Sequence, residues 1–139
     1  MSRGLQYYKY RNIPSDVKDK ILNVLVNENI MAILLYGSYG TEKQKESSDL
    51  DIALLTYNKL SLVDLTKLRL KLEKELDIIV DLKQIYSNSN IVMKLNMLSG
   101  ELLYSSKDYI DYIANFYHEN CDMIDIVVIH SGKGEEYRW

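Results

Sequence analysis

Hydrophobic and polar positions alternate with two different periods along the chain, and these periods divide it into helices and strands. Apolar residues recur at helical spacing over residues 15–28, after Ser15 as a candidate N-cap, so we expect a helix there. Two short apolar runs, residues 30–36 and 49–56, have the length and composition of buried strands. A second helical pattern opens at Ser61 and continues to about residue 76.

The second half of the chain predicts further elements. Residues 77–82 (DIIVDL) favour a third strand, with Asp81 near its end. We also expect a helix over 88–98 capped by Ser87 or Asn88, a strand over 101–104, and a helix opened by Ser106 or Asp108. Beyond residue 120 the pattern is ambiguous, because residues 124–129 (IDIVVI) fit either another strand or a continued helix.

Length and composition indicate one globular domain. The chain has 139 residues, of which 47% are hydrophobic and 27% are charged. We divide it into an N-terminal extension (1–12), a domain (13–120) and a C-terminal tail of uncertain structure (121–139). A net charge of −3 argues against broad binding to nucleic acid, which needs a basic surface.

The same composition indicates a cytoplasmic protein that does not contact a membrane. No apolar run approaches the roughly 20 residues that span a bilayer, and the N-terminus lacks the pattern of a signal peptide. The single cysteine, Cys121, excludes an intramolecular disulfide and a cysteine-based zinc cluster, and we expect it to be buried as a small apolar residue.

Twelve tyrosines stand against one phenylalanine and one tryptophan. Two interpretations remain open, since tyrosine suits both the edge of a core and a protein interface. The tyrosines concerned are Tyr7, Tyr8, Tyr10, Tyr104, Tyr109, Tyr112 and Tyr117.

The stretch between the first two strands, residues 37–52 (GSYGTEKQKESSDLDI), carries the candidate chemistry. Gly37 allows the backbone to approach a ligand closely, and Ser38 can offer a hydroxyl and backbone N–H groups to a phosphate. Lys43, in the polar loop, is a candidate cation for a triphosphate. A Gly-Ser turn alone is a weak signal, so the carboxylates that follow it decide the interpretation.

Three aspartates follow this turn on neighbouring strands. Asp49 and Asp51 are two residues apart, so their side chains project from the same face of a strand, and Asp81 lies on the next strand. Three such carboxylates can hold two divalent cations such as Mg²⁺ about 4 Å apart and stabilise an in-line phosphoryl or nucleotidyl transfer. Asp49 and Asp51 would bridge the metals and the triphosphate, and Asp81 would complete the second metal site and help to deprotonate an attacking hydroxyl.

Gly37-Ser38, ten intervening residues, Asp49-Leu50-Asp51 and Asp81 together resemble the signature of the polymerase-β-type nucleotidyltransferase superfamily. The small size and the later NMLSGELLY make residues 14–104 similar to the minimal nucleotidyltransferase (MNT-domain) antitoxins of HEPN/MNT toxin–antitoxin systems. The sequence departs from the family at Gly40, Thr41 and Glu42, where many members have Ala-Arg-Gly, so no arginine stands there for the phosphates.

This resemblance implies both a fold and a reaction. The fold would be an α/β (α+β) nucleotidyltransferase fold, a mixed β-sheet with helices packed mainly on one side. The enzyme would use Mg²⁺, with two ions expected, to transfer AMP from ATP to a tyrosine hydroxyl of a cognate HEPN RNase toxin, which it thereby neutralises. The catalytic residues would be Asp49, Asp51 and Asp81, and the nucleotide would bind at Gly37, Ser38 and Lys43.

Two other functions remain open. The chain could be a non-catalytic binding module that inhibits the toxin by contact alone. It could also be a small-molecule nucleotidyltransferase of the aminoglycoside type, which we rank lower because 139 residues leave no room for a substantial second substrate-binding domain.

Overall fold

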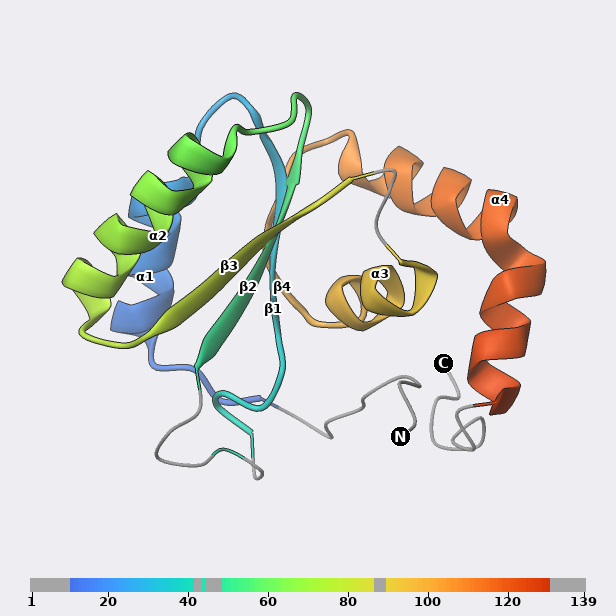
Figure 1. The fold of residues 1–139 in the computed structure, drawn as a ribbon, viewed down its shortest axis with the longest axis horizontal. Helices are drawn as coiled ribbons and strands as arrows, with labels where there is room; N and C mark the ends of the chain where they lie inside the picture. Colours follow the sequence, from blue (N-terminus) through green and yellow to red (C-terminus); the bar gives the residue numbers. More distant parts are fainter. Residues whose placement is uncertain (1–10, 42–43, 45–48, 87–89, 131–139) are drawn as a thin grey trace.

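A computed structural model describes residues 11–41, 44, 49–86 and 90–130, the last six by their backbone alone. Figure 1 shows a sheet with helices on both sides. The elements, in chain order, are α1 (Ser15–Leu25), β1 (Ile30–Tyr36), β2 (Leu50–Thr56), α2 (Leu62–Leu76), β3 (Val80–Ile85), α3 (Ile91–Leu98), β4 (Glu101–Ser105) and α4 (Tyr109–His130).

The sheet has four strands in the order β3-β2-β1-β4. β1 is antiparallel to both of its neighbours, whereas β2 and β3 are parallel and are connected through α2. A parallel pair needs such a crossover, since a tight turn can join only antiparallel strands. The predicted mixed α/β sheet is therefore confirmed.

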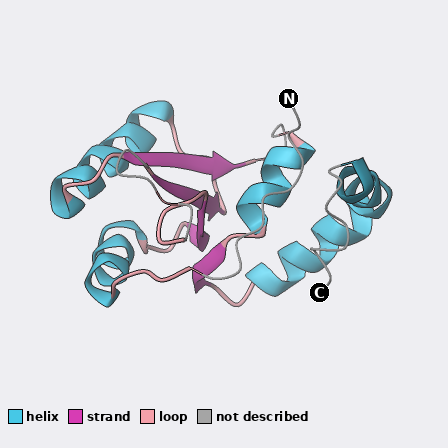
Figure 2. Cartoon of the chain, turned by 90° about the horizontal axis from the view of Figure 1, so that it is seen from below, coloured by secondary structure: helices cyan, strands magenta, loops and turns pink. Residues whose placement is uncertain are grey.

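Helices cover both faces of the sheet rather than gathering mainly on one side, as Figures 1 and 2 show. α1 and α2 pack on one face, where the core includes Ile21, Leu72 and Ile52. α3 and the first part of α4 pack on the other face around Ala53 and Phe116. The central strands are apolar on both faces, so each face needs a cover. Helices on one side alone would leave residues such as Ala53 in water.

α2 begins as predicted, but the strand after it, β3, begins later than predicted. Ser61 caps α2 as predicted, since its hydroxyl accepts a hydrogen bond from Asp64 N–H at 3.1 Å. Asp77 ends the helix in a left-handed conformation with φ of 54°, and Glu73 bonds the backbone N–H of Val80 at 2.9 Å. Residues 77–79 therefore form the turn, and Asp81 is near the start of β3 rather than near its end.

Two helix starts and one helix end also differ in detail. α1 begins at Ser15 itself, follows Pro14 and ends at residue 25 rather than 28. α3 begins at Ile91 and is capped by Asn90, whose side chain accepts the N–H of Val92 at 2.8 Å, while Ser87 and Asn88 lie outside the described residues. α4 continues to residue 130, so the helical alternative is right for residues 124–129, and the boundary that we placed at residue 120 falls inside a helix.

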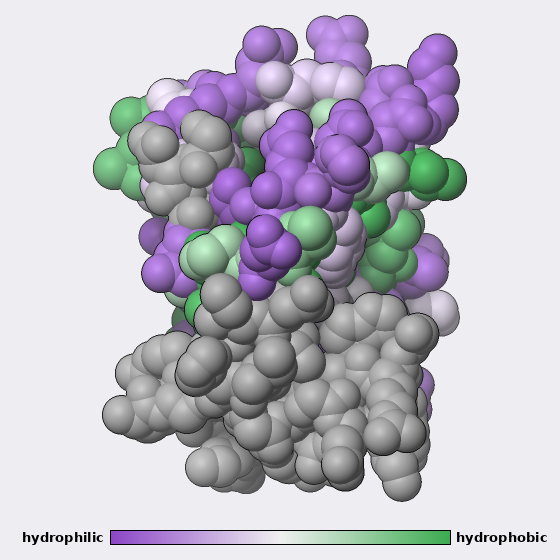
Figure 3. Space-filling model, turned by 90° about the vertical axis from the view of Figure 1, so that its right-hand side faces the viewer, coloured by the Kyte–Doolittle hydropathy of each residue, from purple (hydrophilic) through white to green (hydrophobic). Residues whose placement is uncertain are grey.

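The described tyrosines of the second half lie at the edge of the core. Tyr109, Tyr112 and Tyr117 pack against the cluster under α4, and Tyr104 packs against the opposite cluster. This favours the core-edge interpretation for these four, while Tyr7, Tyr8 and Tyr10 lie outside the described residues. On the side of the molecule where α4 lies, the described residues that Figure 3 colours are mostly hydrophilic, with scattered apolar ones among them.

Two further expectations can be compared with the structure. Cys121 is exposed on α4, so the expectation that it is buried is wrong. Ile124, on the same helix, is buried in the core, so the covered part of α4 at this end includes Ile124 but not Cys121.

Within the described ranges, no helix is both long enough and apolar enough to span a bilayer.

Candidate active site

Three side chains form a row across one end of the sheet. Tyr36, the last residue of β1, is the register partner of Asp51 on β2, and Asp51 is the register partner of Asp81 on β3. Directly paired residues project from the same face of a sheet. The structure therefore brings Asp51 and Asp81 together on the face that α3 and α4 cover farther along, and it adds Tyr36 to them.

The Asp51 carboxyl group is partly buried and lies among other carboxylates. Partial burial is the main cause that raises the pKa of this carboxyl group to about 6, and the charges of Asp81 and Asp49 raise it further. A hydrogen bond between the Asp51 and Asp81 side chains acts in the same direction, while the ammonium group of Lys83 opposes it. Lys83 Nζ lies 3.4 Å from Asp81 Oδ2. Two carboxyl groups this close favour either a shared proton or a cation.

Gly37 lies directly against the Asp51 carboxylate. Its φ of 75° is in the left-handed region, and a Cβ atom built on it would collide with Oδ2 of Asp51. The position therefore requires glycine for two reasons, backbone conformation and space. The structure therefore places the Gly37 backbone directly beside the Asp51 side chain, and a functional site shared by the two stays a prediction.

The described part of the turn is held by local hydrogen bonds. The N–H and hydroxyl groups of Thr41 both donate to the carbonyl of Ser38, at 3.0 and 2.5 Å. Gly40 also has a left-handed φ, of 79°, and its N–H donates to Gln44 Oε1 at 2.6 Å. Ser38 thus lies in a turn, and Lys43 lies outside the described residues.

Sequence reasoning missed Arg11, which contacts the turn from the N-terminal segment. Its guanidinium group donates to the carbonyl of Tyr39 at 2.6 Å and to that of Gly37 at 2.8 Å, with a longer bond of 3.5 Å to Tyr36. The backbone N–H of Asn12 also donates to the Gly40 carbonyl at 2.8 Å. No motif indicated this contact, because its acceptors are backbone atoms.

The hydroxyl group of Tyr36 was missed as well. It is buried, and none of the described residues accepts or donates a hydrogen bond to it. Burial, followed by the charges of Asp51 and Asp81, raises the pKa of this phenol. A buried polar atom without a partner is rare and often marks a functional position.

The donor set fits a hard divalent cation only in part. Asp51 and Asp81 supply two adjacent carboxylates, the ligand type that Mg²⁺ prefers, and a cation between them would relieve their repulsion. Asp49 is exposed just before β2 and acts on Asp51 through its charge. Within the parts of the chain that the structure describes, no three His, Cys, Asp or Glu side chains are close enough together to hold a metal ion. The convergence of all three aspartates remains a prediction.

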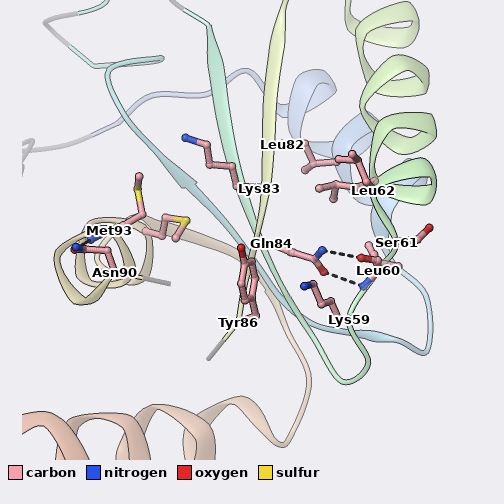
Figure 4. A pocket seen from close by; sticks show the side chains of 12 residues that line it. Lys59, Leu60, Ser61, Leu62, Leu82, Lys83, Gln84, Tyr86, Asn90 and Met93 are labelled. Carbon is pink, nitrogen blue, oxygen red and sulfur yellow. Dashed lines mark hydrogen bonds between the residues drawn. The ribbon is translucent and has the colours of Figure 1, made fainter. Parts of the chain in front are cut away.

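A cavity of about 870 Å³ lies along β3, which is an edge strand of the sheet (Figure 4). Apolar residues of β3 and α3 line it together with Lys59, Lys83 and Tyr86. Gln84 connects β3 to the loop before α2, because its side-chain amide bonds both the N–H and the carbonyl of Leu60, at 2.9 and 2.8 Å. Lys83 belongs to both regions, since it lines the cavity and pairs with Asp81.

Comparison with known proteins identifies the family. A family model described as polymerase beta nucleotidyltransferase matches residues 19–109, about two thirds of the chain. The chain belongs to this family. The matched range contains the Gly37 turn, the three aspartates and the whole sheet, so the superfamily that the motif indicated is confirmed.

Two curated relatives of this chain are named as protein adenylyltransferases, one of them as a putative one. A putative protein adenylyltransferase of Methanocaldococcus jannaschii is 35% identical over 69 residues, which are 47% of this chain and 74% of the relative. The protein adenylyltransferase MntA of Shewanella oneidensis is 30% identical over 92 residues, which are 65% of this chain and 66% of the relative.

Solved structures of toxin–antitoxin complexes share the fold of this nucleotidyltransferase. One contains a tri-AMPylated Shewanella oneidensis HEPN toxin in complex with MNT antitoxin. The match to it has a TM-score of 0.56 and 26% identity and covers 81% of this chain and 97% of the other. Another is a toxin–antitoxin with AMP-PNP, matched with a TM-score of 0.57 and 26% identity over 83% of this chain and 98% of the other.

Proposed function

We propose that this nucleotidyltransferase is an antitoxin that transfers AMP from ATP to a tyrosine hydroxyl of a cognate HEPN RNase toxin and so neutralises it. The observation that carries the proposal is the Asp51–Asp81 pair against Gly37, in a chain whose relatives are protein adenylyltransferases. The solved complexes support a HEPN partner and an ATP-like nucleotide. Because ATP and RNA are both abundant in the cytoplasm, the proposal places the reaction there.

The proposed reaction needs an acceptor for the proton of the tyrosine. The phenol oxygen attacks the α-phosphorus of ATP, a new P–O bond forms, and the bond to pyrophosphate breaks. The proton of the phenol passes to a carboxylate, for which Asp81 is placed beside Asp51 at the edge strand of the sheet. The Gly37-Ser38 turn would cradle the phosphates that leave, and Lys43 would add positive charge.

Asp49, Asp51 and Asp81 would hold the magnesium. When bound, Mg²⁺ would neutralise the charge that builds up on the phosphates. In its absence the carboxyl group of Asp51 has a raised pKa, so its affinity for a cation is coupled to the loss of a proton.

The test uses the full chain with a HEPN-domain protein as the candidate partner. With ATP and Mg²⁺, intact-mass spectrometry should show AMP-sized additions to the partner and loss of its RNase activity. The double substitution Asp49→Asn/Asp51→Asn should slow the addition by about a thousandfold or more, since it removes charge that acts on the transferring phosphate. The matched control, Asp64→Asn/Asp122→Asn, changes two exposed carboxylates on α2 and α4 and should leave it unchanged.

The alternatives give different results in the same assay. If the double variant still adds AMP at the wild-type rate, these aspartates do not carry the reaction and the proposal fails. If the wild-type chain inhibits the RNase without adding mass, and the double variant inhibits equally well, the chain acts by contact alone.

A further inference from the structure

A residue of the N-terminal segment, Arg11, contacts the turn that carries Gly37. The guanidinium group of Arg11 bonds the carbonyls of Gly37 and Tyr39 at 2.8 and 2.6 Å, and that of Tyr36 at 3.5 Å. These carbonyls lie at least 25 positions away in sequence. A single side chain thus bonds the end of β1 and the turn that follows it.

These contacts fix the orientation of individual peptide units. In a trans peptide the C=O and N–H groups point in opposite directions. When Arg11 bonds the carbonyls of Tyr36 and Gly37, the N–H groups of Gly37 and Ser38, which belong to the same peptide units, point away from the guanidinium group. Backbone N–H groups aligned in this way are the usual donors to phosphate.

Arg11 adds to the hydrogen bonds within the turn, in which Thr41 donates to the Ser38 carbonyl and the Gly40 N–H donates to Gln44. Gly37 and Gly40 both have left-handed φ values and no side chain to pack. The segment that carries Arg11 packs on Gly40 too, since a Cβ there would collide with the Ile13 side chain. The planar guanidinium fork has five donors and can bond several carbonyls at once, whereas an ammonium group presents a single charged point.

We propose that Arg11 is a positioning residue: through its hydrogen bonds to backbone carbonyls it locks the Gly37–Gly40 turn in the conformation that binds the phosphates of ATP. This inference rests on the proposed function for the identity of the nucleotide.

The test compares Arg11→Lys and Arg11→Met with Arg69→Lys. Arg69 is a matched control, since it pairs with Glu73 at 3.1 Å on the far helix α2. Calorimetry with ATP and Mg²⁺ should give a Kd about tenfold higher for Arg11→Lys, the effect of about 1.4 kcal/mol expected when a charge-assisted fork is lost. Arg11→Met should weaken binding further, and Arg69→Lys should bind as the wild type does.

A second readout reports the turn itself. Arg11→Lys should shift the amide NMR signals of Gly37 and Gly40 and speed their hydrogen exchange, while the signals of α2 stay in place. In a transfer assay the KM for ATP should rise more than kcat falls, because the reacting carboxylates are untouched.

The outcomes separate the inference from the proposed function. Wild-type affinity for ATP in Arg11→Met, or unchanged amide signals in Arg11→Lys, would overturn the role of Arg11. If the wild-type chain does not bind ATP, the proposed function fails, and the amide signals still decide whether Arg11 orders the turn. Should Arg11→Met fail to fold, Arg11→Lys, which keeps the charge, carries the test. A lower melting temperature with unchanged affinity would show a structural role only and count against the inference.

Discussion

The two faces of β2 differ although they alternate along the same seven residues. Leu50, Ile52 and Leu54 are fully buried under α1 and α2. The opposite face begins with Asp51 and becomes apolar only at Ala53 and Leu55, under α3 and α4. One face is therefore apolar from end to end, while the other changes from charged to apolar within two residues.

This difference shows how the strand combines stability with chemistry. Because side chains alternate, the buried face can hold the backbone in place while the other face presents a carboxylate at its open end. Asp51 thus stands between two completely buried neighbours, which limit its movement. The same alternation makes each face testable by single substitutions at adjacent positions.

The largest expected effect comes from placing a carboxylate on the apolar face. Ile52→Asp should lower the free energy of unfolding by about 4 kcal/mol or more, because it buries an unpaired charge and leaves a cavity. Urea denaturation followed by circular dichroism measures this change. The control Ile52→Val should cost only about 1 kcal/mol. A loss below 1 kcal/mol for Ile52→Asp would mean that this face tolerates charge and that the two faces are not distinct.

A smaller effect on stability should come from the charged face, where the protonation of Asp51 makes the free energy of unfolding depend on pH. The pKa of Asp51 is raised from 3.8 to about 6, so the folded state holds this proton more tightly than the unfolded state does. The resulting stability is complete below pH 4 and is lost as pH rises through 6. A shift of two units corresponds to about 3 kcal/mol, which solvent screening of this half-exposed group reduces to about 1 to 2 kcal/mol.

The measurement is the difference in free energy of unfolding between wild type and Asp51→Asn, taken without divalent cations from pH 4 to 7. As pH rises from 4 to 7, the free energy of unfolding of the wild type should fall by about 1 to 2 kcal/mol more than that of the variant. Asp122→Asn, on the exposed surface of α4, should run parallel to the wild type. A difference that is flat with pH would contradict the electrostatic description of the row.

Much of this comparison could be predicted from the sequence. The apolar run of β1 predicts its bounds correctly, because length and composition leave few alternatives for a buried strand. The sequence also indicates that Asp51 and Asp81 lie on neighbouring strands, which the register of β2 and β3 confirms, while a site shared with Asp49 stays a prediction. The pattern of the sequence was sufficient to predict β1 because the bounds of this strand depend on residues that are close together in the chain.

Contacts between distant segments could not be predicted in this way. Arg11 bonds backbone carbonyls, which every residue has, so no side-chain pattern indicates the contact. Tyr36 joins the carboxylates only through the register of three strands. The late start of β3 depends on the left-handed conformation of Asp77, which an aspartate adopts only in some contexts.

The smallest predicted effect concerns the hydroxyl group at the end of the row. Tyr36→Phe should raise the free energy of unfolding by about 1 kcal/mol, because it removes a buried hydroxyl that has no partner among the described residues. Tyr57→Phe is the matched control: the Tyr57 hydroxyl donates to Asp108 at 2.6 Å, so its loss should lower stability slightly. Thermal melts of both variants without nucleotide measure these changes: the melting temperature should rise for Tyr36→Phe and fall for Tyr57→Phe. If Tyr36→Phe also destabilises the protein, the Tyr36 hydroxyl has a hydrogen-bond partner in solution. The charged face would then lack the unpaired polar group that its geometry indicates.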